Sequence, residues 1–252
     1  MLGVREMGSL TSLAGRRRRR RQARLVEPFD WALTAPARSV RSDVQDLVLF
    51  PVVRFFAKLT TEGRQHLDDL DGPVVLVSNH TSHLDCPVIL SALPRRVRRR
   101  TLVAAAADYF YKAKALGAVT SLALGTVPFK RRDGSRQSIE KLKEGLRRGW
   151  SVLMFPEGGR SRNGELGRFK QGAAYICLDT HAAAVPIYIE GAHELMPKGS
   201  SMPKQGDVLI RFGPPIKPRP DDDYASFTAR MEDAIVLLSG DLPGARETPR
   251  AG

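Results

Sequence analysis

The feature that most constrains the fold is an alternation, from Pro73 onward, of short apolar runs with longer stretches in which apolar residues recur at helical spacing. Short apolar runs are typical of strands buried on both faces of a sheet, and the periodic stretches are typical of helices that cover it. The expected strands are residues 74–77, 102–105, 126–129, 151–155, 185–189 and 208–212. The expected helices are residues 86–93, 109–116, 135–149, 172–181 and 227–238. This alternation predicts an α/β fold, a single domain with a mixed, largely parallel sheet flanked by helices.

Length and composition agree with one domain. With 252 residues, 42% of them hydrophobic, the chain can bury one sizeable core. We expect a disordered arginine-rich tail over residues 1–24, a helical segment over 25–68, the main domain over 69–240 and a second disordered tail over 241–252. Cys86 and Cys177 lie far apart and match no zinc or redox spacing, which predicts a reducing compartment and no disulfide.

The positive charge of the chain gathers near its N-terminus. Residues 1–24 contain eight arginines, six of them consecutive, and one acid, so this tail carries +7 of the net charge of +13. Such a run does not pack into a core, and it can bind anionic lipids or nucleic acid. A solvated tail without a partner is the alternative. No apolar stretch follows the arginines before Glu27, so the pattern is not that of a secretory signal.

Residues 47–59 form a second segment that suits a lipid surface. Nine of these thirteen positions are large and apolar, while Arg54 and Lys58 can extend toward headgroups. The uninterrupted run from Leu47 to Val53 has seven residues, whereas a spanning helix needs about 20. We therefore expect an interfacial helix, a segment that covers the core of its own domain, or both on different faces. The interfacial reading predicts peripheral attachment to the cytoplasmic face of a membrane.

Two short motifs carry the chemistry. They are Asn79-His80-Thr81-Ser82-His83-Leu84-Asp85 and Phe155-Pro156-Glu157-Gly158-Gly159-Arg160-Ser161. An imidazole titrates near neutral pH, so His80 can take a proton from a hydroxyl while the carboxylate of Asp85 fixes its tautomer. A spacing of five suits a strand-to-helix turn, with His80 in the turn and Asp85 at the helix start. Both motifs follow expected strands, so one cleft at the carboxyl edge of the sheet can contain them.

Four short sequence blocks follow one another along the chain. They are the His-x4-Asp block from Asn79 to Asp85, then Gly125 to Arg131, Phe155 to Ser161 and Val185 to Ile189. With them, and with the connecting Phe169-Lys170-Gln171-Gly172, the sequence resembles the glycerolipid acyltransferases of the 1-acylglycerol-3-phosphate acyltransferase type, the bacterial family often called PlsC. The resemblance covers roughly residues 60–215 and marks residues 69–240 as an acyltransferase domain.

The resemblance implies transfer of a fatty acyl group from a thioester, acyl-CoA or acyl-carrier protein, to the hydroxyl of a lysophosphatidate-like acceptor, with no further cofactor. His80 would act as general base and Asp85 would hold its imidazole, so the substrate hydroxyl attacks the thioester directly. No enzyme nucleophile is then required, which agrees with the absence of a Gly-x-Ser-x-Gly elbow. Cys86 is expected to be a small buried residue.

The resemblance also implies an acceptor site built from the second and third blocks. Arg131 and Arg160 would contact the acceptor phosphate through their guanidinium groups. Gly158 and Gly159 let the backbone approach an anion closely. Glu157 would orient an arginine or a glycerol hydroxyl, because a carboxylate beside an anion site is otherwise repelled.

One departure from the family pattern leaves the acceptor open. Where many members carry a phosphate-binding lysine, this chain reads Ala104-Ala105-Ala106-Ala107-Asp108-Tyr109-Phe110. A lost cation weakens charge-assisted binding of a phosphate. The alternative is therefore a different polar acceptor, unless Lys112 or the arginines within 95–100 compensate.

Three other classes of protein account for single features. His80, His83 and Asp85 suggest metal ligands, but their spacing differs from that of common metal-dependent hydrolases. The basic composition suggests nucleic acid, but no aromatic residues interleave the basic clusters and no binding motif is recognisable. A non-catalytic membrane-binding module of the same fold is the third alternative, against which His80, Asp85, Glu157 and Arg160 are all intact.

Overall fold

The computed structural model describes residues 34–106, 123–129, 135–197, 199–200 and 202–240. Two compact units are distinguished, Met1–Val40 and Arg41–Gly252, and helix α2 (Ala35–Val44) spans their boundary. The sheet and the helices that cover it belong to the second unit. The helix expected over 109–116, the tails expected over 1–24 and 241–252, and Arg131 lie outside the described residues.

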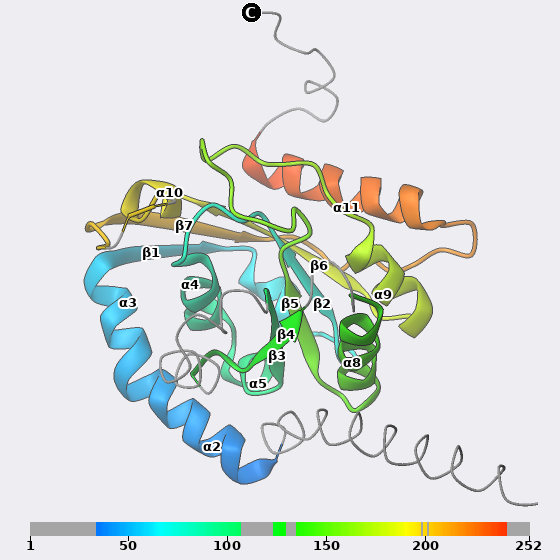
Figure 1. Cartoon of the computed structure of the whole chain (residues 1–252), viewed down its shortest axis with the longest axis horizontal. Coiled ribbons are helices and arrows are strands. Elements are labelled where there is room, and N and C mark those ends of the chain that lie inside the picture. The colour runs from blue at the N-terminus through cyan, green and yellow to red at the C-terminus, as the bar shows by residue number, and fades with distance from the viewer. Residues whose placement is uncertain (1–33, 107–122, 130–134, 198, 201, 241–252) are drawn as a thin grey trace, which may run out of the picture. The chain divides into compact units, whose positions relative to one another are not determined.

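The described residues form a seven-stranded sheet in the order β1-β7-β6-β2-β5-β3-β4 (Figure 1). The strands are β1 (Ala57–Glu62), β2 (Val75–Ser78), β3 (Thr101–Ala106), β4 (Thr126–Phe129), β5 (Ser151–Met154), β6 (Ala184–Glu190) and β7 (Gly206–Phe212). Five of the six strand contacts are parallel, and only β6 with β7 is antiparallel. The mixed, largely parallel sheet is therefore confirmed.

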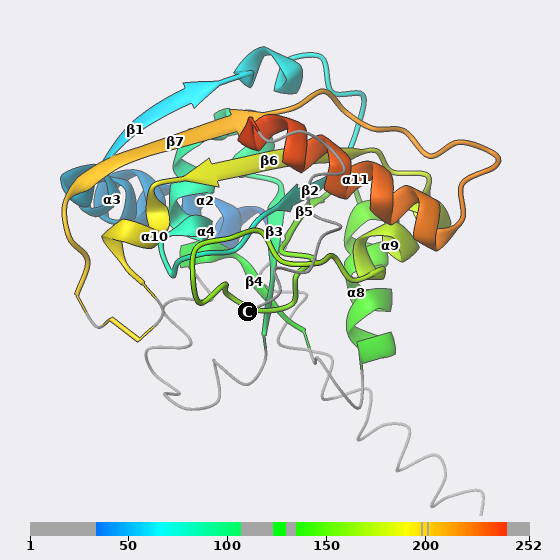
Figure 2. The same ribbon diagram turned by 90° about the horizontal axis from the view of Figure 1, so that it is seen from above.

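Helices cover both faces of this sheet (Figures 1 and 2). One row consists of α8 (Ser135–Arg147), α9 (Gly172–Thr180) and α11 (Tyr224–Ser239), which contact β4, β5, β2 and β6. The other row contains α3 (Phe50–Phe56) and α4 (Asp85–Ala92), which contact each other and β1. Two short helices, α5 (Arg95–Arg98) and α10 (Ala192–Leu195), lie in connections. The helices expected over 86–93, 135–149, 172–181 and 227–238 are confirmed.

Burial explains why the central strands could be predicted from the sequence. Every residue of β2 and of β5 is buried, so both strands must be apolar or hydrogen-bonded along their whole length. Leu76, Ile89, Leu153 and Ile187 are fully buried in the core that α4 and the sheet enclose. The carboxyl ends of β2 and β5 are adjacent because these two strands pair in parallel register. The two sequence motifs therefore begin side by side.

The segment expected to be helical over 25–68 is helical only in part. A π-helical turn (Gln45–Leu49) leads into α3, which ends at Phe56, and residues 57–62 extend as β1. The sheet therefore begins inside a range expected to be helical. In β1 only Ala57 is buried, because the strand lies at the sheet edge, so it lacks the apolar run that marks a strand.

Residues 47–59 cover the core of their own domain with one face and expose apolar side chains on the other. Phe50 and Val53 are buried against the core, while Leu47 and Phe55 are 77% and 66% exposed. Among the described residues, no helix combines the length and apolar character that a membrane-spanning segment requires.

Candidate active site

The turn after β2 is held by a side chain that extends the sheet. The Asn79 amide donates to the carbonyl oxygen of Ile189 at 2.9 Å, and its own oxygen accepts the Ile189 N–H at 2.8 Å. This paired contact continues the β2–β6 ladder by one residue beyond Ser78. The strand end, and with it the start of the first motif, is thereby fixed. Sequence reasoning gave Asn79 no role of its own.

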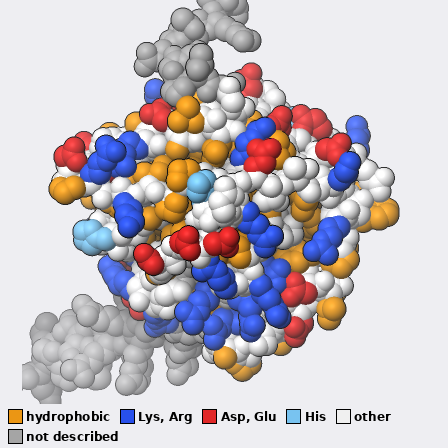
Figure 3. All heavy atoms as spheres, turned by 180° about the vertical axis from the view of Figure 1, so that it is seen from behind, with side chains coloured by type: hydrophobic (Ala, Val, Ile, Leu, Met, Phe, Trp, Pro, Cys, Tyr) orange, Lys and Arg blue, Asp and Glu red, His pale blue; other side chains and the backbone are white. Residues whose placement is uncertain are grey.

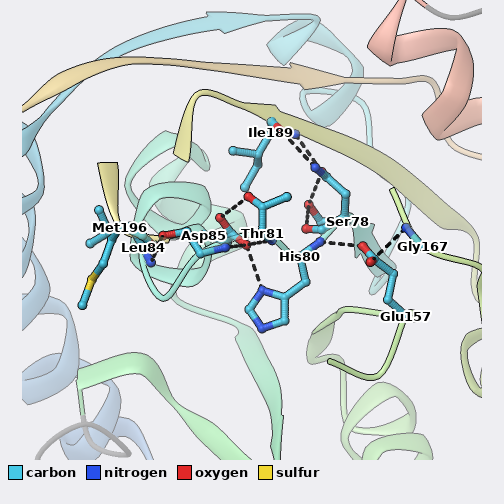
Figure 4. Close-up of polar contacts among 11 residues, drawn as sticks. Ser78, His80, Thr81, Leu84, Asp85, Glu157, Gly167, Ile189 and Met196 are labelled. Atoms are coloured by element: carbon cyan, nitrogen blue, oxygen red, sulfur yellow. Dashed lines mark hydrogen bonds and ion pairs between the residues drawn. The ribbon is translucent and has the colours of Figure 1, made fainter. Parts of the chain in front are cut away.

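His80 and Asp85 meet as expected across the strand-to-helix turn. The distance from His80 Nδ1 to Asp85 Oδ2 is 2.8 Å, and Asp85 is fully buried at the first residue of α4 (Figure 4). Asp85 Oδ2 also accepts the backbone N–H groups of Thr81 at 2.6 Å and Ser82 at 2.9 Å. Because a carboxylate only accepts, the contact assigns the imidazole proton to Nδ1 and leaves Nε2 free to take a proton.

The imidazole is restrained on one face as well. Its ring stacks on Phe155 with 4.1 Å between centroids and 20° between planes. The side chain of His80 keeps 20% of its surface exposed. Stacking and the contact with Asp85 together define the direction of Nε2, and the remaining exposure provides access for a substrate.

The second motif contacts the first directly. Glu157 Oε1 accepts the backbone N–H of His80 at 2.7 Å, and Oε2 accepts the N–H of Gly167 at 3.1 Å (Figure 4). The N–H of Ser161 donates to the carbonyl oxygen of His80 at 2.7 Å. Burial raises the pKa of Glu157, and its two N–H donors oppose that rise. These backbone contacts of Glu157 were not foreseen, because the residues they join are distant in sequence.

A hollow of about 450 Å³ lies beside this contact. It is lined by residues 157–161, Asn163 and residues 165–168. Arg160, Gly158 and Gly159 are thus brought together as expected, and His80 adjoins the hollow through its bonds to Glu157 and Ser161 without lining it. Arg131, expected here too, lies outside the described residues.

Arg160 carries an unused donor. Its Nη1 atom is buried and has no hydrogen-bond partner among the described residues. Burial lowers the pKa of His83, and the positive charge of Arg160 lowers it further, so the guanidinium acts on the first motif at His83. A buried guanidinium nitrogen without a partner is costly unless a ligand supplies an acceptor. The arrangement therefore suits an anion bound near His80.

Gly158 fits the same interpretation. Its φ of +74° belongs to the left-handed region, and a Cβ there would lie 2.6 Å from Lys170 Nζ. The ammonium of Lys170 therefore lies close to Gly158, which lines the hollow. Lys170 is an exposed residue of the loop before α9.

Two alternatives bear on the same residues. Burial, with a contribution from the charge of Asp85, strongly raises the pKa of the Cys86 thiol, which makes it a poor nucleophile. No group of three or more histidine, cysteine or acidic side chains suited to a metal ion occurs in the part of the chain that the structure describes.

Comparison with known proteins identifies relatives. Residues 58–190 match the family model described as Acyltransferase. The chain is 35% identical over 164 residues to the chloroplastic 1-acyl-sn-glycerol-3-phosphate acyltransferase LPAT1 of Arabidopsis thaliana, a match that covers 64% of this chain and 44% of that protein. The chloroplastic BAT2 of Brassica napus, with the same enzyme name, is also 35% identical over 164 residues, 64% of this chain and 46% of its own length. The matches thus span less than half of these two relatives.

The fold has a solved counterpart. The crystal structure of the 1-acyl-sn-glycerophosphate acyltransferase PlsC from Thermotoga maritima superposes with a TM-score of 0.61 at 23% sequence identity, covering 82% of this chain and 84% of that one.

Proposed function

Because this chain belongs to the acyltransferase family, we propose that it transfers a fatty acyl group from a thioester donor to the hydroxyl of a lysophosphatidate-like glycerophospholipid. The observation that carries the proposal is the His80–Asp85 contact, bound through the His80 backbone to the loop whose Arg160 has a buried nitrogen with no hydrogen-bond partner among the described residues. One group supplies a base and the other a buried positive charge for the phosphate of the acceptor. The donor is a pantetheine thioester, acyl-CoA or acyl-carrier protein.

The transfer requires one proton acceptor and no covalent enzyme intermediate. His80 Nε2 takes the proton of the acceptor hydroxyl while its oxygen attacks the thioester carbonyl carbon. Asp85 stabilises the imidazolium through the 2.8 Å contact at Nδ1. When the C–S bond breaks, the imidazolium returns the proton to the thiolate that leaves. The ester, the free thiol and neutral His80 are the products.

The acceptor site combines fixed charge with accessible backbone. Arg160 offers its guanidinium, and the Lys170 ammonium beside Gly158 adds a second cation. Arg131 is proposed as a third. The positive charge of Lys170 can replace that of the lysine missing from residues 104–110. This favours a phosphate-bearing acceptor over another polar acceptor. A protein that only binds membranes would not need a histidine held in place by an aspartate.

A panel of acceptors tests this function. The purified protein, given acyl-CoA or acyl-carrier protein, should acylate lysophosphatidate in preference to monoacylglycerol, which lacks the phosphate. Arg160→Gln should raise the KM for lysophosphatidate about 10- to 100-fold, as the loss of a charge-assisted contact predicts. Arg162→Gln, an exposed neighbour that does not line the hollow, is the matched control. Equal use of both acceptors by the wild type would refute the phosphate site.

We further propose that the protein attaches peripherally to a membrane, on its cytoplasmic face. Leu47, Val48, Val52 and Phe55 form an exposed apolar face along the π-helical turn and α3. Positive charge is not confined to the N-terminal arginines, since Lys and Arg side chains gather over the lower part of the surface in Figure 3. An exposed apolar face on a protein that also carries a basic surface suits anionic lipid.

The double substitution Leu47→Glu with Phe55→Glu should reduce binding to vesicles of phosphatidylglycerol and phosphatidylcholine at least about tenfold, because each side chain loses apolar burial of about 1.5–3 kcal/mol. Sedimentation with vesicles measures the effect. Leu237→Glu on α11, 61% exposed in the wild type, is the control and should bind normally. Unchanged binding of the double variant would exclude this face from membrane attachment.

A further inference from the structure

We propose that Glu157 is a positioning residue that joins the peptide of His80 to the loop carrying the acceptor site, rather than a residue that binds the acceptor. The inference rests on the proposed function, because positioning has meaning only for a catalytic His80. It differs from the role that the family resemblance implied, in which Glu157 orients an arginine or a glycerol hydroxyl. The two roles predict different kinetic effects.

Each oxygen of the carboxylate already has a backbone partner. Oε1 accepts from His80 N–H at 2.7 Å and Oε2 accepts from Gly167 N–H at 3.1 Å. Figure 4 shows Glu157 directed at the backbone of His80, on the side opposite to Asp85 and away from the imidazole. The side chain thus spans from the first motif to the loop between β5 and α9.

The peptide groups of His80 are bound on both sides by this loop. Its N–H donates to Glu157, and its carbonyl oxygen accepts the N–H of Ser161. Arg160 lies between these two loop residues in sequence. The same pair of contacts therefore restrains the backbone of His80 and the loop backbone that carries Arg160.

The close approach of Gly167 to the Glu157 carboxylate indicates that the fold makes room for this contact. A Cβ on Gly167 would lie 2.8 Å from Glu157 Oε2, so any larger residue would displace the carboxylate. A carboxylate suits this place better than an amide, because it only accepts hydrogen bonds and can satisfy both N–H groups. A glutamine would direct its NH₂ group at one of the two donors.

The consequence for catalysis is geometric. Asp85 and Phe155 restrain the ring of His80, but neither fixes its backbone relative to Arg160. Glu157 supplies that restraint. A displacement of about 1 Å between a base and a bound substrate can cost about 100-fold in rate.

Glu157→Gln should therefore lower kcat about 10- to 100-fold while the KM for lysophosphatidate stays within about twofold. Arg160→Gln should instead raise the KM for lysophosphatidate and leave kcat nearly unchanged. Glu194→Gln, an exposed glutamate on α10, is the matched control and should match the wild type in both constants. A rise in KM at unchanged kcat would make Glu157 an acceptor ligand and overturn the inference, as would unchanged values of both.

A second readout separates this inference from the proposed function. In protein labelled with ¹⁵N-histidine, Glu157→Gln should shift the His80 amide proton upfield as its 2.7 Å bond to a carboxylate is lost, and Glu194→Gln should not. Gly167→Ala tests the same contact from the other side and covers a failure of Glu157→Gln to fold. An unshifted His80 amide in the folded variants would overturn the inference. If the wild type acylates no acceptor while Glu157→Gln still shifts the His80 amide, the proposed function is refuted and the inference about the contact stands.

Discussion

Substituting alanine for His80 is expected to lower the rate of acyl transfer by about 10²- to 10⁴-fold, the usual contribution of a positioned general base. The imidazole is the group whose Nε2 is free to take a proton, since its Nδ1 is bound to Asp85 at 2.8 Å. Steady-state rates with a labelled acyl donor and lysophosphatidate measure the effect. Binding to anionic vesicles should persist, because His80 lies in the turn after β2 and the exposed apolar face lies on α3 and the turn before it.

The control for this substitution is a histidine elsewhere on the surface. His181→Asn changes an exposed residue after α9 that has a φ of +55°, a conformation that asparagine tolerates well. It should leave the transfer rate within about twofold of the wild type, as surface substitutions usually do. Transfer by His80→Ala at a rate close to the wild type would remove His80 as the base.

Asp85→Asn is expected to lower the rate by a comparable factor, about 10²- to 10⁴-fold, while the fold is retained. Three N–H donors, from His80, Thr81 and Ser82, converge on Oδ2. An amide oxygen at the same place can accept all three, and the amide nitrogen would then face the hydroxyl of Thr81 where Oδ1 lies now. What disappears is the negative charge that stabilises the imidazolium.

Asp85→Ala separates this effect from a structural one. It removes the acceptor of all three donors, of which the Thr81 and Ser82 N–H groups are buried, and each buried N–H left unsatisfied costs about 1–3 kcal/mol. Its free energy of unfolding, from urea denaturation, should fall by several times more than that of Asp85→Asn. Normal turnover by a folded Asp85→Asn enzyme would show that the carboxylate charge has no part in catalysis.

Two of the strands located from the sequence are buried along their whole length. Residues 74–77 and 151–155 were expected as strands because sheet interiors admit only apolar or paired groups, and β2 and β5 are buried throughout. β1 was missed for the converse reason. It pairs through its backbone with β7 at the sheet edge, and its exposed Lys58, Thr60 and Thr61 carry no strand pattern.

At the site, the sequence was informative about residue types and local spacing. The His80–Asp85 contact was expected because both residues belong to one turn, where five residues determine the geometry. The contacts of Asn79 with Ile189 and of Glu157 with His80 were not, because they join positions 110 and 77 residues apart. The distance between such positions depends on the packing of the whole sheet.

The largely parallel α/β sheet, with a histidine and an aspartate at the end of one strand, follows from the sequence, because periodicity and short spacings are local properties. Two features follow only from the folded chain: Glu157 holds the backbone of His80, and a buried nitrogen of Arg160 has no hydrogen-bond partner among the described residues. Both depend on which strands become neighbours, and the pairing of β2 with β5 is a property of the assembled core.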